Sequence, residues 1–309
     1  MIKGLERNRY VYHYTGFDSL FCLLEGYRKG LYKGHLPFWG FNVFNANDPM
    51  EMKVGFNAVK AFICNSGIES EVPEIQKLSE VYENIRNEEL CKKEYLGANH
   101  DQYSSFIPYT VSFSAKRDFM PMWSLYGKMG KGVSLVFDAI EMIENLEDLC
   151  QFGFVAYDKE TNMNALNEMI PPLYKWYTDR NSQPTIETKI NELSSICYAV
   201  SPFFKCEDYK YESEFRIARS NHYSCLSSLE GSSEEIKRII LRTITSNSST
   251  KLVIPSHIDI PISINSLIEI IIGPCANFDV MEHIIRKELS ECNLNNIKIT
   301  PSKVPYRNK

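Results

Sequence analysis

Two carboxylates and one guanidinium lie close together in residues 212–216, Glu-Ser-Glu-Phe-Arg. If this stretch is a strand, Glu212, Glu214 and Arg216 point to the same side, because successive side chains of a strand alternate between its faces. The charge of Arg216 would then keep the carboxylates ionised. On a solvent-facing strand such groups form ion pairs worth about 0–1 kcal/mol each. In a cleft, a charged carboxylate stabilises the cation that develops on a sugar when a glycosidic bond breaks. The segment alone leaves both interpretations open.

Other polar side chains lie on two further expected strands. His13 and Thr15 share one face of residues 10–15, Tyr-Val-Tyr-His-Tyr-Thr, and could hydrogen-bond a ribose or an amide. A histidine satisfied within the core is the more common situation. Ser112 and Ser114 also share a face, where they could bind a ligand or support a neighbouring strand.

Two aromatic residues, Trp123 and Tyr126, are three positions apart in Met-Trp-Ser-Leu-Tyr-Gly, on one face of an expected short helix. This spacing usually indicates core packing. Aromatic faces also stack on nicotinamide or adenine rings, so a ligand contact is the second interpretation.

Several common catalytic signatures are missing. The sequence contains no GxxxxGK[ST] phosphate loop, no GxGxxG, no GxSxG and no HExxH. The six histidines are far apart, and the nine cysteines form no CxxC pair. We therefore expect no metal site and no disulfide framework. The expected absence of disulfides is typical of a protein in the reducing cytoplasm.

The overall composition is that of a globular protein, with 44% hydrophobic residues in a chain of 309. The formal net charge of −5 does not indicate nucleic-acid binding. We see no signal peptide and no membrane span, and expect a cytoplasmic protein.

The hydrophobic patterns predict an α+β fold in a single domain, residues 1–309, with two helical insertions at about 50–106 and 160–200. Residues 31–52 look irregular and rich in aromatic side chains. Strands are expected at 10–15, 109–114, 131–138, 153–158, 212–217, 251–255, 267–274 and 297–307. Helices are expected at 18–27, 118–127, 138–150 and 279–292.

Six segments in order resemble a bacterial family described only as a domain of unknown function. They are YHYTGFDSL, FNANDPMEM, SFSAKRDFMPMWSLYGKMGKGVSLVFD, YESEFRI, EIIIGP and SKVPYR. The resemblance extends from Tyr12 to Arg307. One departure is Gly16, where the family usually has serine or threonine.

The family is distantly similar to the ADP-ribosyltransferase fold, which has a split, mixed β-sheet. That fold carries a histidine or arginine on its first strand, a serine or aromatic motif on a middle strand and a glutamate on a later strand. His13, the Ser112–Ser114 stretch with Tyr126, and Glu214 follow the same order.

The resemblance implies that NAD is the substrate. Glu214 would be the catalytic carboxylate, Glu212 would orient the acceptor, and Arg216 would keep the pair ionised. The residues that would hold NAD are His13, Tyr14, Thr15, Ser112, Ser114, Trp123 and Tyr126.

The expected activity is that of an NAD-using ADP-ribosyltransferase or NAD glycohydrolase, with a role as a bacterial toxin or in phage defence. The acceptor of ADP-ribose is open. One alternative is a non-catalytic module that binds NAD, ADP-ribose or a signalling nucleotide. Another is a structural or interaction protein whose charged strand is solvated.

Overall fold

A computed structural model describes residues 8–43, 48, 50, 52–65, 108–146, 150–158, 164, 166–167, 197–220 and 257–305. The strands in these ranges form one mixed sheet, in which only β8 and β9 run parallel. The strands are β1 (Tyr10–Thr15), β2 (His35–Asn42), β3 (Pro108–Ser114), β4 (Val133–Asp138), β5 (Cys150–Phe154), β6 (Glu214–Ser220), β7 (His257–Ser263), β8 (Leu267–Ile272) and β9 (Lys298–Pro301). The helices are α1 (Phe17–Arg28), α2 (Lys53–Asn65), α5 (Met120–Leu125), α6 (Ala139–Glu144) and α11 (Phe278–Glu291), with 3₁₀ turns η4 (Ser201–Phe203), η5 (Glu207–Glu212) and η7 (Ile264–Ser266).

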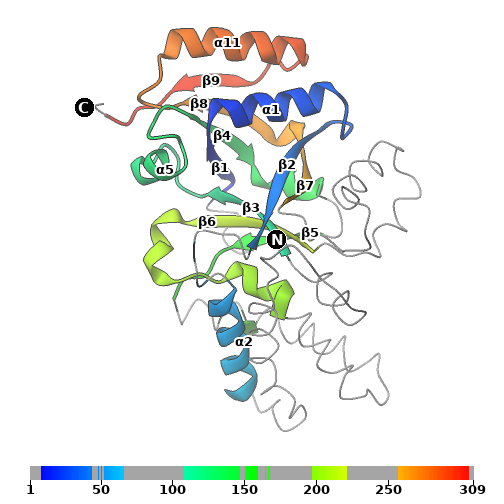
Figure 1. Ribbon diagram of the computed structural model, residues 1–309, viewed down its shortest axis with the longest axis vertical. Helices are drawn as coiled ribbons and strands as arrows, with labels where there is room; N and C mark the ends of the chain where they lie inside the picture. Colours follow the sequence, from blue (N-terminus) through cyan, green and yellow to red (C-terminus); the bar gives the residue numbers. More distant parts are fainter. Residues whose placement is uncertain are drawn as a thin grey trace, which may run out of the picture.

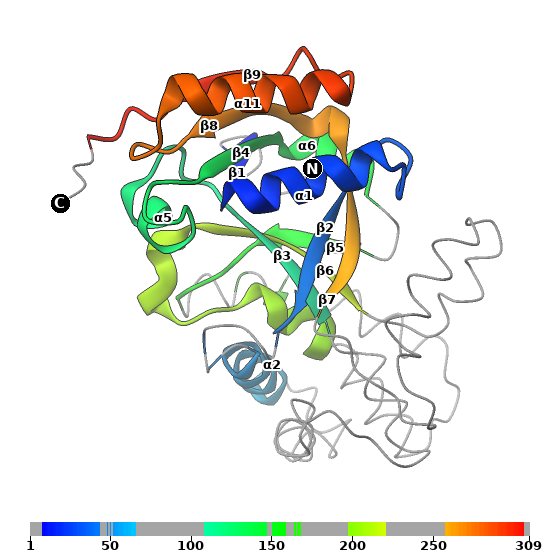
Figure 2. The same ribbon diagram turned by 45° about the horizontal axis from the view of Figure 1, so that its top comes forward.

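The main core lies on one face of the sheet, and α1 and α11 lie side by side next to it (Figures 1 and 2). Leu20, Leu23 and Leu24 form the buried stripe of α1, as the spacing predicts. A smaller cluster on the other face includes Tyr14 and Trp123. The sheet is therefore covered on both faces near its centre.

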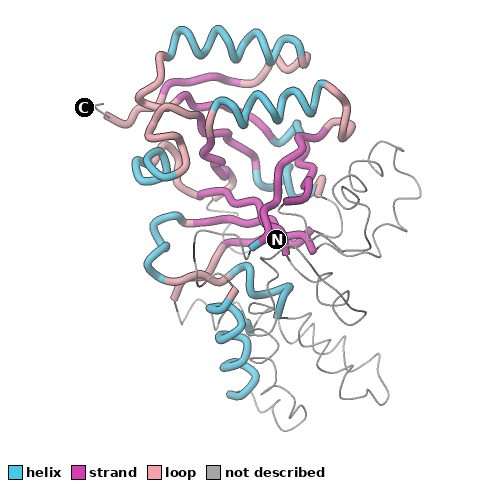
Figure 3. The backbone as a smooth tube through the Cα atoms, viewed as in Figure 1, coloured by secondary structure: helices cyan, strands magenta, loops and turns pink. Residues whose placement is uncertain are grey.

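Strand β3 changes its partner along one edge. It pairs with β2 at Tyr109 and Thr110, and with β1 at Ser114. Its other edge pairs with β6 along the whole strand, from Pro108 to Ser114. The sheet thus opens between β1 and β2, beside the middle of β3, and the tube in Figure 3 shows these strands diverging.

The sequence patterns predicted several elements correctly and misplaced others. Strand β1 has the predicted bounds. Residues 31–52 were expected to be irregular, but they contain β2, because Phe38 packs into the core while its neighbours Trp39 and Phe41 face outward. Helix α6 ends earlier than predicted, at Glu144, and β7 was not predicted.

The charged stretch 212–217 is not one strand. Residues Glu207–Glu212 form the 3₁₀ turn η5, and Ser213 adopts a left-handed conformation with φ of 44°. Strand β6 begins only at Glu214. The polar residues Glu, Asp and Lys before this point favour a turn over a strand.

Only the ends of the two expected insertions belong to the described residues. Helix α2 lies in the first, and a helical turn at 197–200 lies at the end of the second. Most of both insertions, the strand expected at 251–255 and the last two residues of the SKVPYR segment lie outside the described part. The single-domain organisation stays a prediction.

None of the helices in the described part of the chain is long and apolar enough to cross a membrane.

Candidate functional site

A cavity of about 440 Å³ lies over the opening in the sheet. This volume is within the range of about 300–1,000 Å³ that is usual for small-molecule sites. Side chains from β1, β2, β3, β6, α5, η5 and the segments between these elements line it. They are Tyr12, His13, Tyr14, Trp39, Phe41, Asp48, Thr110, Val111, Ser112, Phe113, Ser114, Met122, Tyr126, Lys205, Tyr209, Glu212, Glu214 and Arg216.

Four buried charged residues form one wall of the cavity, and we call them the ion cluster: Lys205, Glu212, Glu214 and Arg216. Lys205 Nζ lies 2.6 Å from Glu212 Oε2 and 3.3 Å from Glu214 Oε2. Arg216 donates through Nε and Nη2 to the two oxygens of Glu214, at 2.7 and 3.0 Å. Two positive and two negative charges therefore balance among side chains that are 4–8% exposed.

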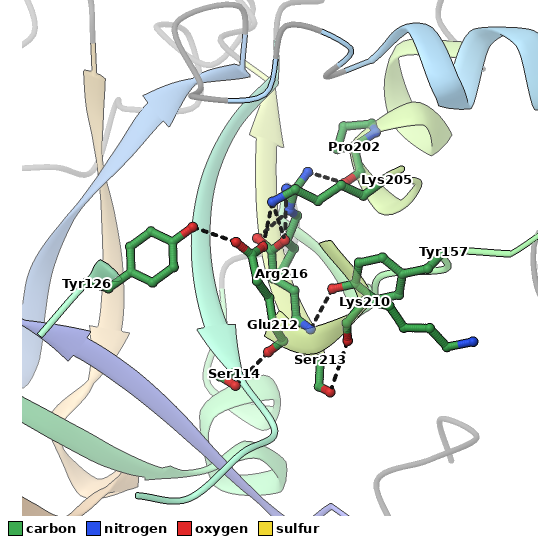
Figure 4. Close-up of polar contacts among 10 residues, drawn as sticks. Ser114, Tyr126, Tyr157, Pro202, Lys205, Lys210, Glu212, Ser213 and Arg216 are labelled. Atoms are coloured by element: carbon green, nitrogen blue, oxygen red, sulfur yellow. Dashed lines mark hydrogen bonds and ion pairs between the residues drawn. The ribbon is translucent and has the colours of Figure 1, made fainter. Parts of the chain in front are cut away.

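The left-handed turn at Ser213 brings the two glutamates together. Glu212 ends η5 and Glu214 begins β6, so strand alternation alone does not place them on one side. Ser114 Oγ donates to the backbone carbonyl of Glu212 at 2.6 Å, and the Tyr157 hydroxyl accepts from the backbone N–H of Glu214 at 2.8 Å (Figure 4). These bonds fix the backbone on both sides of the turn.

Electrostatics hold Glu214 and Lys205 ionised. Burial would raise the pKa of Glu214, but the charges of Arg216 and Lys205 outweigh it and lower the pKa to about 2, with a further contribution from the Ser112 side chain. Burial would lower the pKa of Lys205, yet the two glutamates raise it overall. The expected ionising role of Arg216 thus has a physical basis here, shared with Lys205.

Tyr126 connects the ion cluster to the open part of the cavity. Its hydroxyl donates to Glu212 Oε1 at 2.6 Å, and 37% of the residue is exposed (Figure 4). Burial and the nearby Glu212 charge raise the pKa of the phenol, so it stays a neutral hydrogen-bond donor. A ligand in the cavity can therefore reach Tyr126 before it reaches the buried cations.

His13 lies in the opening between the strands. Its Nδ1 lies 2.9 Å from the carbonyl oxygen of Ser112, which can only accept, so Nδ1 carries the proton. Phe38 and Phe113 pack against the ring, and burial lowers the pKa of the imidazole. His13 is therefore neutral, with Nε2 as an acceptor.

The register puts His13 and Glu214 on opposite sides of a continuous sheet. Tyr12 pairs with Ser114, and Ser114 pairs with Glu214, so the side chains of these three residues lie on one face of the sheet. His13 follows Tyr12 in β1, so its side chain lies on the other face. Both line the same cavity because the sheet is open at this place.

The other expected residues have mixed positions. Ser112 is exposed in the cavity, whereas Ser114 is buried and supports the turn. The Tyr14 hydroxyl is occupied, because it donates to Lys116 O and accepts from Phe119 N. Thr15 is not among the residues that line the cavity.

Trp123 does not have the position that was expected of a stacking residue. It is completely buried, its ring meets that of Tyr14 edge to face, and its indole N–H donates to Asp118 at 2.8 Å. The Asp118 carboxylate does not cap α5; it accepts from Trp123, from Ser302 and from the backbone N–H of Lys303. Trp123 is therefore a buried residue that packs against Tyr14 of the cavity lining.

Among the cavity residues that sequence reasoning missed, those that matter most for the arguments below are Trp39, Phe41, Asp48 and Lys205. The alternation Phe38-Trp39-Gly40-Phe41 was a usable strand signal, hidden by the aromatic content of the segment. Lys205 had no local signal, because it meets the glutamates only through the fold. Within the described residues, no group of three or more histidine, cysteine, aspartate or glutamate residues is arranged to hold a metal.

Comparison with known proteins gives one match. Residues 122–217 match the model of a family described as a protein of unknown function, DUF2971. The matched segment begins at Met122 in α5 and ends at Ile217 in β6, so it contains the whole ion cluster and Tyr126. No curated protein and no solved structure matches the chain.

Proposed function

We propose that the cavity binds NAD and that the protein cleaves the bond between nicotinamide and ribose, as an ADP-ribosyltransferase or NAD glycohydrolase. The observation that carries this proposal is that His13, Ser112, Tyr126 and Glu214 line one cavity although they are distant in sequence. The opening of the sheet beside β3 also agrees with a split sheet of the ADP-ribosyltransferase kind.

In this reaction the bond from the nicotinamide nitrogen to C1′ of the ribose breaks, and nicotinamide leaves with the electron pair. Positive charge develops on the ribose. Water or another acceptor then bonds to C1′ and loses a proton to solvent. A carboxylate near C1′ lowers the barrier because it stabilises that charge.

The contacts favour Glu212 over Glu214 as the carboxylate nearest the ribose. Both oxygens of Glu214 already accept from Arg216, which offsets its negative charge. Glu212 Oε2 accepts from Lys205, and Glu212 Oε1 accepts from the partly exposed Tyr126. We assign Glu212 to the ribose and Glu214 to the support of Lys205 and Arg216, which exchanges the roles that the resemblance implies.

The remaining residues have roles that follow from their hydrogen-bonding capacity. His13 Nε2 can accept from a ribose hydroxyl, because Nδ1 carries the only ring proton. Ser112 is exposed in the cavity, and its hydroxyl, which interacts with Glu214, can still accept from a ligand. Tyr126 offers both a ring face and a hydroxyl to the nicotinamide end.

The test is the release of nicotinamide from NAD by the purified protein, with candidate acceptors absent and present. Glu212→Gln should reduce the rate about 100-fold, the scale of one lost preorganised electrostatic contact. Glu269→Gln is the control, because Glu269 forms a similar ion pair with Arg117 outside the cavity. Folding of each variant is checked by its melting temperature.

The proposal fails if the wild type releases no nicotinamide under any of these conditions. It also fails if Glu212→Gln and Glu269→Gln slow the reaction equally.

A second candidate is a module that binds NAD or ADP-ribose without cleaving it. The charge balance of the ion cluster favours this candidate, since two cations offset the carboxylates that would stabilise a sugar cation. Such a module would show a ligand-induced thermal shift, about 2.7 kcal/mol of stabilisation at 100 times Kd, with no release of nicotinamide.

A further inference from the structure

Two aromatic residues of β2 are exposed on the wall of the cavity. Trp39 and Phe41 are each 54% exposed, although large aromatic side chains usually lie inside. Gly40 between them faces the core, where a Cβ would come within 2.5 Å of Ile260. The close packing of β2 on β7 therefore directs Trp39 and Phe41 outward.

The orientation of Trp39 is fixed by a neighbour. His257 of β7 stacks on its indole ring, with ring centroids 4.5 Å apart and an angle of 30° between the planes. Phe41 pairs with Thr110 of β3, so both aromatic side chains lie on the face of the sheet that carries Ser112 and Ser114. A preformed aromatic surface of this kind suits a flat ring.

Asp48 supplies a polar group to the same cavity. The residue is only 5% exposed, and one carboxylate oxygen accepts from the backbone N–H of Met50 at 2.8 Å. Its second oxygen, Oδ2, is buried and has no hydrogen-bond partner among the described residues. A buried acceptor of this kind is costly unless a donor reaches it, and a ligand in the cavity can bring that donor.

We propose that Trp39, Phe41 and Asp48 form a subsite for a planar nitrogen base that carries an amino group, namely the adenine of NAD. The aromatic rings stack on the base, and Asp48 Oδ2 accepts from its exocyclic amine. This assignment rests on the proposed function, because NAD is the proposed substrate. The subsite would bind its adenine end, which takes no part in the reaction.

Position along the sheet distinguishes this base from nicotinamide. Phe41 pairs with Thr110, and Glu214 pairs with Ser114, four residues further along β3. At about 3.3 Å per residue, the two places are about 13 Å apart along the strand. Nicotinamide is joined directly to the ribose that the ion cluster meets, whereas adenine is separated from it by a diphosphate and a second ribose.

The first experiment measures the binding of the two halves of NAD by calorimetry. Trp39→Ala should weaken AMP binding about tenfold or more, because one base–aromatic stack is lost. Binding of nicotinamide mononucleotide should change less than twofold. Trp39→Phe should restore most AMP binding, and Tyr10→Ala, an exposed aromatic of β1 outside the cavity, is the matched control.

The second experiment exchanges the donor and acceptor at position 48. In Asp48→Asn the side-chain oxygen is needed for the N–H of Met50, so the amide N–H₂ takes the place of Oδ2. The wild type should prefer AMP to inosine monophosphate, which has an oxygen in place of the amine. The variant should reverse this preference.

The outcomes separate this proposal from the proposed function. If AMP binding depends on Trp39 while NAD is never cleaved, the subsite stands and the activity fails. If NAD is cleaved while Trp39→Ala leaves AMP binding unchanged, the activity stands and the subsite is overturned. Absence of AMP binding to the wild type at millimolar concentration, or an equal loss of both half-ligands in Trp39→Ala, also overturns the subsite.

Discussion

Two arginine–carboxylate pairs in the same sheet have similar geometry and different surroundings. Arg117 donates to both oxygens of Glu269 at 2.9 Å, and Arg216 does the same with Glu214 at 2.7 and 3.0 Å. The Arg117 side chain is 47% exposed, whereas that of Arg216 is 4% exposed. Water can replace the partner of Arg117 but not that of Arg216, so similar contacts have different energetic consequences.

The surroundings also differ in charge. Glu269 is supported by Thr300, a neutral donor at 2.6 Å. Glu214 shares Lys205 with a second carboxylate, Glu212, so the four groups of the ion cluster are connected through Glu214 and Lys205. We conclude that the first pair stabilises the sheet locally, while the second is a coupled unit on a cavity wall.

The largest expected difference between the two pairs is in stability. Arg216→Ala leaves Glu214 buried without its guanidinium and should lower the free energy of unfolding by about 3–5 kcal/mol. Arg117→Ala leaves Glu269 with its hydrogen bond from Thr300 and should cost less, about 1–2 kcal/mol. Urea denaturation of both variants measures this, and equal losses would mean that burial does not distinguish the pairs.

The pH dependence of stability should sharpen the comparison. The pKa of Glu214 is lowered to about 2 in the folded state, so its contribution is complete above the unfolded pKa near 4.3 and is lost as the pH falls toward 2. The contribution amounts to about 3 kcal/mol on the linkage relation.

The corresponding measurement compares the wild type with Glu214→Gln from pH 6 to pH 3. Their difference in unfolding free energy should shrink as the pH falls, because only the wild type loses a charged group. The pKa of Glu269 is also lowered, mainly by its hydrogen bond with Arg117, so Glu269→Gln should show the same sign. A constant difference for Glu214→Gln would contradict the lowered pKa.

The smallest expected effect on stability is at Tyr126. Tyr126→Phe removes the hydroxyl that donates to Glu212 and should change the free energy of unfolding by about 1 kcal/mol. If Glu212 acts on the ribose, nicotinamide release should fall about tenfold, equivalent to about 1.4 kcal/mol. Tyr32→Phe is the control, because Tyr32 donates to Asp259 away from the cavity. An unchanged rate of nicotinamide release in Tyr126→Phe would show that the Tyr126 hydroxyl does not contribute to the reaction.

Local sequence patterns correctly predicted β1 and α1, whose formation depends on the order of apolar and polar residues within each segment. Strand β1 and the leucine stripe of α1 follow from alternation and helical spacing. The carboxylates and Arg216 could be selected from the sequence because charged residues beside a buried strand are unusual. Strand β2 was missed because Trp39 and Phe41 made the segment look uniformly aromatic, and their outward direction depends on the packing of Gly40 against Ile260.

The sequence by itself determined which groups are available: two glutamates and an arginine within five residues, a histidine on the first strand and the aromatic pair Trp123 and Tyr126. Only the tertiary structure decided which of them meet. Lys205 joins the glutamates because η5 and the left-handed Ser213 fold the chain back, Trp123 is withdrawn because Asp118 holds its indole, and His13 reaches the cavity because β3 changes partner. Residue types are fixed locally, but burial and pairing are set by contacts between distant segments, and these contacts determine the charge and the hydrogen-bonding role of each group.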